Sequence, residues 1–235
     1  MNFWEDFGFF KNSVVSMSGY CTQLDHSKPI YRARKKDFEN ITDKKELTYL
    51  QKEDCIKLRR ANIPYHPVFY GSFDPACAVA EITDNNEAVI LTEWQWKESA
   101  KIRAKLFAKI EHSDSLKRFN IQTVEEYHAG IENLKGPIEK NNLIKEMMNR
   151  SAHLSDLFLI EHDYFASAIL GYEELYRTRI SIVENTDAII YPSIVSKHDV
   201  NIAIHPEIVD EYLELKKIWE LNSSDLEDLK LIWES

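Results

Sequence analysis

The hydrophobic pattern of this 235-residue chain changes its period along the sequence, and this change restricts the possible folds most strongly. Over residues 101–110, apolar and polar side chains alternate with a period of two. This alternation predicts a half-buried strand, antiparallel to the strand before it. From Thr123 onward the pattern becomes helical. Apolar runs typical of short strands return at 187–192 and 200–204, joined by a polar turn.

A β-rich core with a helical insertion accounts for these changes. Thr123 and Glu126 have the spacing of a capping box, and two or three helices are expected between 123 and 180. The predicted fold class is therefore α+β, with one domain over residues 1–235 and a helical insertion at about 115–180. A chain of this length buries roughly 70–75% of its unfolded surface, so its core needs no metal or disulfide.

Local signals predict the remaining elements. Asp74 followed by Pro75 is typical of a helix N-terminus, because aspartate caps free N–H groups and proline suits the first turn. Helices are predicted at 75–84 and 206–215, strands at 30–33, 66–72 and 87–96, and a loop with some helix at 35–58. The C-terminal segment, rich in leucine and tryptophan, fits either a helix or a strand.

Charge and cysteine content restrict the partners and the compartment. The formal charge of -10 argues against direct nucleic-acid binding, because a net negative field repels a polyanion. Cys21, Cys55 and Cys77 lack CxxC spacing, which favours free thiols in a reducing cytoplasm. Glu5 and Asp6 near the N-terminus do not fit a signal peptide, and no apolar stretch has the length of a membrane span. We therefore expect a cytoplasmic protein without a membrane partner.

Several common catalytic patterns are missing. There is no glycine-rich phosphate loop, no HExxH motif and no nucleophile elbow. The eight histidines lack the spacing of metal ligands. No metal cofactor is therefore expected.

Two segments, 59–82 and 190–206, stand out as candidate site regions. Glu81 lies at the end of an apolar helix face, where its carboxylate would be partly buried. A buried carboxylate needs a cation or several hydrogen-bond donors. Two interpretations remain open at this point: an ion pair to Arg32, Arg59 or Arg60 that only holds the core together, or a catalytic role.

The same two segments resemble the signature of the RES-domain family, named for its arginine, glutamate and serine. The matching positions are Tyr31, Arg32, Arg60, Asn62, Tyr70, Glu81, Tyr191, Pro192, Ser193 and Asn201. Family members commonly have glycine before the arginine and in the turn after it, where this chain has Leu58-Arg59 and Tyr65-His66.

The resemblance implies a fold and an activity. RES-domain proteins are similar to the ADP-ribosyltransferase fold, act as bacterial toxins, and consume NAD by cleaving its nicotinamide–ribose bond. The implied fold is an ADP-ribosyltransferase-like β core with a helical insertion, and the implied substrate is NAD. The implied enzyme is an NAD glycohydrolase or phosphorylase, with a cognate antitoxin protein as partner. The alternatives are a protein ADP-ribosyltransferase and a non-catalytic nucleotide-binding or interaction module.

The family roles carry over residue by residue as expectations. The resemblance implies that Glu81 stabilises positive charge on the ribose, that Arg60 and Arg32 bind the pyrophosphate, and that Tyr70 contacts the nicotinamide ring. The implied catalytic residues are Glu81, Arg60 and Tyr70. The implied NAD-binding residues are Arg32, Tyr31, Asn62, Ser193 and Asn201, with Ser193 and Asn201 donating to phosphate or ribose oxygens.

Overall fold

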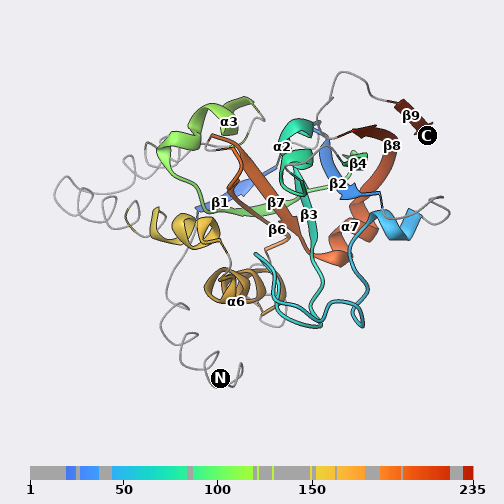
Figure 1. The fold of residues 1–235 in the computed structure, drawn as a ribbon. Helices are drawn as coiled ribbons and strands as arrows, with labels where there is room; N and C mark the ends of the chain where they lie inside the picture. The colour runs from blue at the N-terminus through green and yellow to red at the C-terminus, as the bar shows by residue number, and fades with distance from the viewer. Residues whose placement is uncertain are drawn as a thin grey trace.

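A nine-stranded mixed sheet organises the part of the chain that the computed structural model describes (Figure 1). The described residues are 20–24, 27–36, 44–83, 87–118, 121, 129, 149, 152–161, 163–177, 186–196, 198–222 and 230–234. The N-terminal residues 1–19 and the predicted capping box at Thr123 and Glu126 lie outside them. Strands and helices are both present, which confirms the α+β class.

The strand order across the sheet is β1-β5-β6-β7-β3-β2-β4-β8-β9. The strands are β1 (Tyr20–Gln23), β2 (Ile30–Lys35), β3 (Phe69–Ser72), β4 (Ala88–Trp96), β5 (Arg103–Leu106), β6 (Ala188–Pro192), β7 (Val200–Ile204), β8 (Leu213–Asn222) and β9 (Lys230–Glu234). The helical elements are η1 (Lys44–Leu47), α2 (Pro75–Ala80), η2 (Ile110–His112), α3 (Ser113–Arg118), α6 (Phe165–Tyr172), η3 (Glu173–Arg177) and α7 (Pro206–Tyr212). Among the described strand pairs, β5 and β6 run parallel and the others antiparallel.

The central strands β6 and β7 are buried on both faces, so their sequences read as continuous apolar runs. On one face, Ile190 and Ile202 pack with the main hydrophobic core. On the other face, Tyr191 and Ala203 pack against Phe158, which belongs to the helical residues 152–159. Because side chains alternate along a strand, Ser193 and Asn201 fall on the same face as Tyr191.

Helix α2 crosses from β3 to β4 and packs over β2, as Figure 1 shows. Its start is as predicted: the Asp74 side chain accepts the main-chain N–H of Cys77 at 3.0 Å, and Pro75 occupies the first turn. Its end differs from the prediction, because the helix stops at Ala80 instead of residue 84. Glu81 is consequently the C-cap residue and not part of the helix body.

Strands β2 and β3 share a single paired position, Tyr31 with Ser72. The sheet therefore opens between these two strands. At this opening the main-chain oxygen of Tyr70 in β3 accepts a hydrogen bond from Arg32 Nη1 of β2, at 2.7 Å, instead of one from the β2 main chain. A cationic side chain at a separation between strands is the first structural feature that suggests a ligand site.

The prediction that the strand near residue 103 pairs with its predecessor is wrong. Strand β5 pairs with β1 and β6, while β4 pairs with β2 and β8. Because each edge of β4 is already occupied, β5 must join the sheet elsewhere. The predicted strand is also too long, since Phe107 and Ala108 are both fully buried and no longer alternate.

The C-terminal segment forms strands instead of a helix. The predicted helix at 206–215 ends at Tyr212, and β8 begins at Leu213. In β8, Leu213, Leu215 and Ile218 pack into the main core while the strand pairs with β4 along its length. Burial against β4 thus overrides the helical tendency of these residues.

The described part of the predicted insertion is helical and packs on the sheet. Residues 152–159 are helical, and α6 and η3 follow. Phe158 stacks on Phe107 and on Tyr191, with ring centroids 5.5 Å and 4.8 Å away. Within the described residues, no helix combines the length and apolar character needed to cross a membrane.

Candidate functional site

A carboxylate held by two neutral donors forms the centre of the candidate site. Glu81 Oε1 accepts hydrogen bonds from Ser193 Oγ and from Asn201 Nδ2, both at 2.6 Å. Ser193 follows β6 and Asn201 lies in β7, so three separate segments meet at one oxygen atom. Short distances of this kind are typical of hydrogen bonds to a charged acceptor.

The Ser193 hydroxyl can donate in only one direction. Its oxygen accepts the main-chain N–H groups of Val195 and Ser196, each at 3.2 Å. A hydroxyl has two lone pairs and one proton, so the two N–H groups occupy its acceptor capacity. Its single proton therefore goes to Glu81, and the expected direct bond from Ser193 to a phosphate or ribose oxygen is not available in this arrangement. Asn201 keeps a second amide proton.

The ion pair considered from the sequence is absent, since none of Arg32, Arg59 and Arg60, all described, makes an ion pair with Glu81. The end of α2 adds no positive charge either, because a helix C-terminus carries partial negative charge. The carboxylate depends on Ser193 and Asn201 for its hydrogen bonds. Among the described residues, no cation directly contacts this carboxylate to compensate its negative charge.

The Arg60 side chain contacts the described part of the predicted insertion. Its Nη1 donates to the main-chain oxygen of Phe158 at 2.5 Å, and its guanidinium lies 5.4 Å from the centre of the Tyr164 ring. Only 8% of Arg60 is exposed. The structure therefore gives Arg60 a role in joining its turn to the helical residues, and its predicted contact with pyrophosphate stays a prediction.

Asn62 and Tyr70 form a closed hydrogen-bond group. Tyr70 Oη donates to Asn62 Oδ1 at 2.8 Å and accepts the main-chain N–H of Ala61 at 2.9 Å. Asn62 Nδ2 contacts the sulfur of Cys55 and the main-chain oxygen of Ile63. These contacts leave the Asn62 amide little capacity for a ligand, whereas the Tyr70 ring is partly exposed. Burial raises the pKa of the Tyr70 hydroxyl, which stays protonated at neutral pH.

The turn after Asn62 has a backbone conformation that glycine adopts most easily. Tyr65 has a φ of 63°, and its N–H donates to the main-chain oxygen of Cys55. A non-glycine residue in this left-handed region carries a cost of about 1–2 kcal/mol. The turn thus holds Tyr65 in a backbone conformation that glycine would adopt at lower cost.

Arg32 belongs to a group of three arginines. Burial, followed by the nearby charges of Arg34 and Arg59, holds the pKa of Arg32 well below its usual range. The Nε atom of Arg32 is buried and has no hydrogen-bond partner among the residues that the structure describes. Arg34 donates to the main-chain oxygens of Glu46 and Thr48. Like charges this close, with an unsatisfied donor between strands, favour the binding of an anion.

Tyr31 lies beside α2 instead of beside Glu81. It packs partly buried against the cluster that contains Ala78 and Val79. Burial and the nearby Glu93 raise the pKa of its hydroxyl. The structure therefore does not bring Tyr31 to the central carboxylate.

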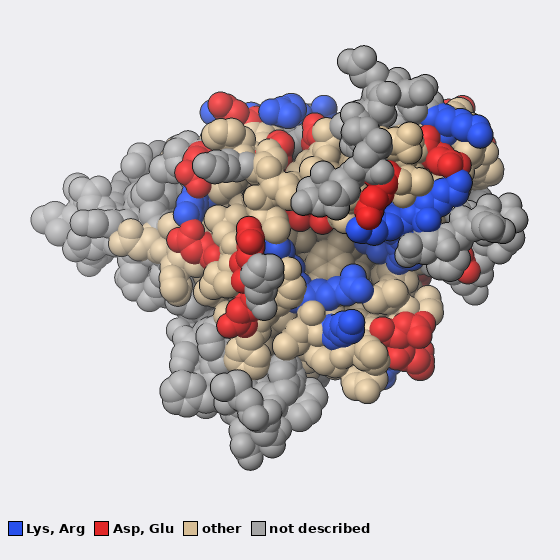
Figure 2. Space-filling view, in the orientation of Figure 1, with Lys and Arg blue, Asp and Glu red and all other residues tan. Residues whose placement is uncertain are grey.

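A hollow lies on the face of the molecule shown in Figure 2, over the region of β3 and β7, with Lys and Arg side chains below it and to its right and acidic side chains at its upper edge. This local positive charge contrasts with the formal charge of -10 for the whole chain. A hollow with fixed cations at its rim suits a small anionic ligand.

Several residues at the site were not identified from the sequence. Exposed Arg59 adjoins Arg60, and the sequence suggests for it only an ion pair with Glu81. Phe158 and Tyr164 carry no sequence signal, because their contacts with Arg60 join segments about a hundred residues apart. Asp199 anchors the turn that carries Ser193, and its position shortly before a strand is the only hint of this role.

The described residues contain no group of three or more histidine, cysteine, aspartate or glutamate side chains placed to hold a metal ion. Comparison with models of protein families found no match, and a search of curated proteins found no significant relative. The residues themselves must therefore support any functional assignment.

Proposed function

We propose that this chain cleaves the nicotinamide–ribose bond of NAD, as a toxin-like enzyme with an ADP-ribosyltransferase-like β core. The observation that carries the proposal is the Glu81 carboxylate, which Ser193 and Asn201 fix while no cation from the described part of the chain contacts it. The order of these residues in the sequence, which resembles the RES-domain signature, supports it independently.

The chemistry needs a fixed negative charge. Departure of nicotinamide leaves positive charge on the ribose, as in glycoside hydrolysis. A carboxylate next to that ribose interacts more strongly with the transition state than with the ground state, and this difference lowers the barrier. Because Ser193 and Asn201 already orient Glu81, little reorganisation is needed during the reaction.

The arginines supply the complementary anion site. Arg32 has a buried Nε without a partner, and Arg59 is exposed close enough to influence it electrostatically. Both can form charge-assisted bonds to a pyrophosphate. We assign pyrophosphate binding to this pair, with Arg60 supporting the turn that carries Arg59.

Alanine variants of the two neighbouring arginines separate these roles. We expect Arg59→Ala to raise the KM for NAD while the melting temperature stays near that of the wild type. We expect Arg60→Ala to lower the melting temperature, because it leaves the Phe158 carbonyl without its buried partner. The reverse result, with KM changed only by Arg60→Ala, would return the pyrophosphate contact to Arg60.

The partner and the compartment follow from the same proposal. A toxin that consumes NAD in the cytoplasm of its host requires a cognate antitoxin protein that blocks the site. Direct contact with nucleic acid is not part of the proposal, since the net charge is negative.

Incubation of the purified protein with NAD tests the proposed function. Free nicotinamide together with soluble ADP-ribose or its phosphate, absent with Glu81→Gln, is the expected result. A mass increase on a protein would instead identify an ADP-ribosyltransferase. Thermal stabilisation by NAD without any nicotinamide release would identify a non-catalytic nucleotide-binding module.

A further inference from the structure

Asp199 makes several hydrogen bonds to the described residues of the turn between β6 and β7. Its main-chain oxygen accepts the N–H of Ser193 at 3.0 Å, and its own N–H donates to the main-chain oxygen of Ser196 at 3.2 Å. The Ser196 hydroxyl donates to Asp199 Oδ2 at 2.5 Å. These bonds tie both ends of the turn together, directly beside the serine that contacts Glu81.

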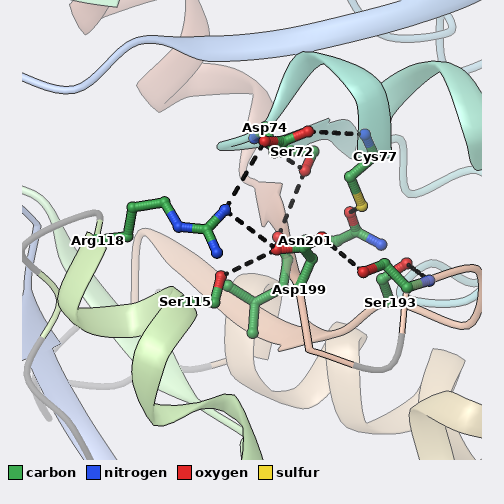
Figure 3. A network of polar contacts seen from close by, with 10 residues as sticks. Ser72, Asp74, Cys77, Ser115, Arg118, Ser193, Asp199 and Asn201 are labelled. Atoms are coloured by element: carbon green, nitrogen blue, oxygen red, sulfur yellow. Dashed lines mark hydrogen bonds and ion pairs between the residues drawn. The ribbon is translucent and has the colours of Figure 1, made fainter.

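The other carboxylate oxygen of Asp199 faces α3, as Figure 3 shows. Ser115 Oγ donates to Asp199 Oδ1 at 3.3 Å, and Arg118 Nη1 lies 3.9 Å from the same oxygen. Arg118 also lies 4.0 Å from Asp74 Oδ2. Asp74 caps the start of α2, and Glu81 caps its end. The Asp199 carboxylate therefore lies where α3, the turn and the start of α2 meet.

The contacts around Asp199 differ in strength. The Arg118 side chain is 57% exposed and its distances are long, so its ion pairs contribute little. The Asp199 side chain is only 18% exposed and accepts hydroxyl protons. Hydrogen bonds to a charged acceptor are roughly twice as strong as neutral ones. The hydrogen bonds of Asp199, and not its ion pair, hold the turn.

We propose that Asp199 is a positioning residue that sets Ser193 and Asn201 so that both donate to the same oxygen of Glu81. The Asp199 carboxylate accepts the hydroxyl proton of Ser196, and the main-chain N–H of Ser196 in turn donates to Ser193 Oγ. Asp199 also lies two residues before Asn201 at the start of β7, and its main-chain oxygen accepts the N–H of Ser193. Its effect on turnover rests on the proposed function, whereas its effect on the geometry does not.

Two variants of Asp199 and one matched control test this role. Asp199→Ala removes both acceptor oxygens, whereas Asp199→Asn keeps one oxygen and loses the charge. The control is Asp210→Ala in α7, because Asp210 likewise accepts a hydroxyl proton, from Tyr49 Oη at 2.7 Å. The first measurement is the NMR signal of the Asn201 side-chain amide, which needs no NAD. The second is kcat and KM for nicotinamide release.

We expect the Asn201 amide signal to move in Asp199→Ala, to return toward the wild-type position in Asp199→Asn, and to stay unchanged in Asp210→Ala. Misplacement of a catalytic group by about 1 Å can cost about 10²-fold in rate. We therefore expect kcat to fall by about 10-fold to 100-fold in Asp199→Ala with KM nearly unchanged, and partial recovery in Asp199→Asn.

An unchanged Asn201 signal in folded Asp199→Ala overturns the proposal, and so does a shifted signal with unchanged kcat in an active enzyme. If the wild type releases no nicotinamide while the signal shifts as expected, the proposed function fails and the positioning role stands. If Asp199→Ala does not fold, Ser196→Ala removes one hydroxyl donor to Asp199 and leaves the turn's main chain intact. An unmoved Asn201 signal in that variant also overturns the proposal.

Discussion

Glu174, which is buried, and Glu81, which is partly buried, differ in their electrostatic surroundings. Glu174 is 6% exposed and forms an ion pair with Lys105 at 2.6 Å, and burial raises its pKa. Glu81 accepts hydrogen bonds from Ser193 and Asn201, which carry no charge. A paired carboxylate has its field cancelled by its partner, whereas one held by neutral donors can act on a new positive charge. This difference distinguishes a structural glutamate from a candidate catalytic one.

Glu81→Gln is therefore expected to lose turnover and keep its fold. Glutamine preserves the size of the side chain and can still accept a hydrogen bond. Loss of one preorganised electrostatic group costs about 10²–10³-fold in rate. The matched control is Glu174→Gln, which leaves Lys105 without its ion-pair partner and should lower the melting temperature without affecting turnover. Melting temperature and nicotinamide release are measured for both variants. A sharp loss of stability in Glu81→Gln, or unchanged turnover, would contradict catalysis by Glu81.

His112 predicts a pH dependence of stability. It is 1% exposed, and its Nδ1 accepts the main-chain N–H of Lys109 at 3.0 Å. Burial lowers its pKa below the ordinary value of 6.5. As the pH falls, the unfolded state takes up the proton at a higher pH than the folded state does. The contribution of His112 to the free energy of unfolding therefore decreases as the pH drops below 6.5 toward the pKa of the folded state. His112→Asn keeps an acceptor and removes the titration. Wild type should lose more stability than this variant between pH 7.5 and about 5.5 in urea unfolding. Equal losses would exclude the histidine as the cause.

At the scale of elements, the helical segment after residue 150 packs against the turn that carries Arg59 and Arg60. Gly171 in α6 lies against the main chain of Ala61, and a Cβ at this glycine would come within 2.3 Å of the Ala61 oxygen. Phe158 and Tyr164 hold Arg60 from the same side. The turn that carries the arginines is thus placed by the segment that the sequence predicted as an insertion.

Gly171→Ala tests this support. Helix propensity alone predicts that alanine stabilises α6 by about 0.5–1 kcal/mol. The contact with Ala61 predicts the opposite, because overpacking costs about 1–3 kcal/mol. We expect a net loss in urea unfolding, together with reduced nicotinamide release as the arginine turn shifts. Ala166→Gly in the same helix controls for propensity and should lower stability without affecting release. A stabilised Gly171→Ala variant would contradict close packing.

At the scale of the whole molecule, the sheet brings together residues that are distant in the chain. Glu81 is 112 residues from Ser193 and 120 residues from Asn201, and the adjacent central strands β6, β7 and β3 bridge these separations. The chain is acidic, yet three arginines gather where β2 and β3 separate. Local placement of charge, and not the net charge, determines which small ligand fits.

The composition of the site also predicts independence from metals. Neutral hydroxyl and amide donors from Ser193 and Asn201 hold the Glu81 carboxylate, whereas a magnesium or calcium site would require several oxygen ligands. We expect nicotinamide release to continue unchanged after treatment with EDTA. The measurement compares rates before and after chelation, with and without added divalent ions. Loss of release on chelation, with recovery on adding a divalent ion, would show that a metal takes part.

The sequence by itself determined several local elements and indicated the two segments that contribute to the candidate site. Asp74 and Pro75 specify the start of α2 through capping, and the apolar runs of β6 and β7 specify two buried strands. Such features depend on near neighbours in the chain, so their signals are local. The proximity of Glu81 to the Tyr-Pro-Ser segment was expected only through the family resemblance.

Only the tertiary structure decided how the side chains are used. The pairing of β5 with β1 and β6 depends on which strand edges remain open, and the ending of α7 at Tyr212 depends on burial of β8 against β4. Arg60 donates to the main-chain oxygen of Phe158, and the Ser193 hydroxyl donates its only proton to Glu81. Both partners lie far away in the sequence and are brought close only by the fold. A hydrogen bond between residues far apart in the sequence produces no periodic pattern of residue types. The partners of Arg60 and Ser193 could therefore be identified only from the folded structure.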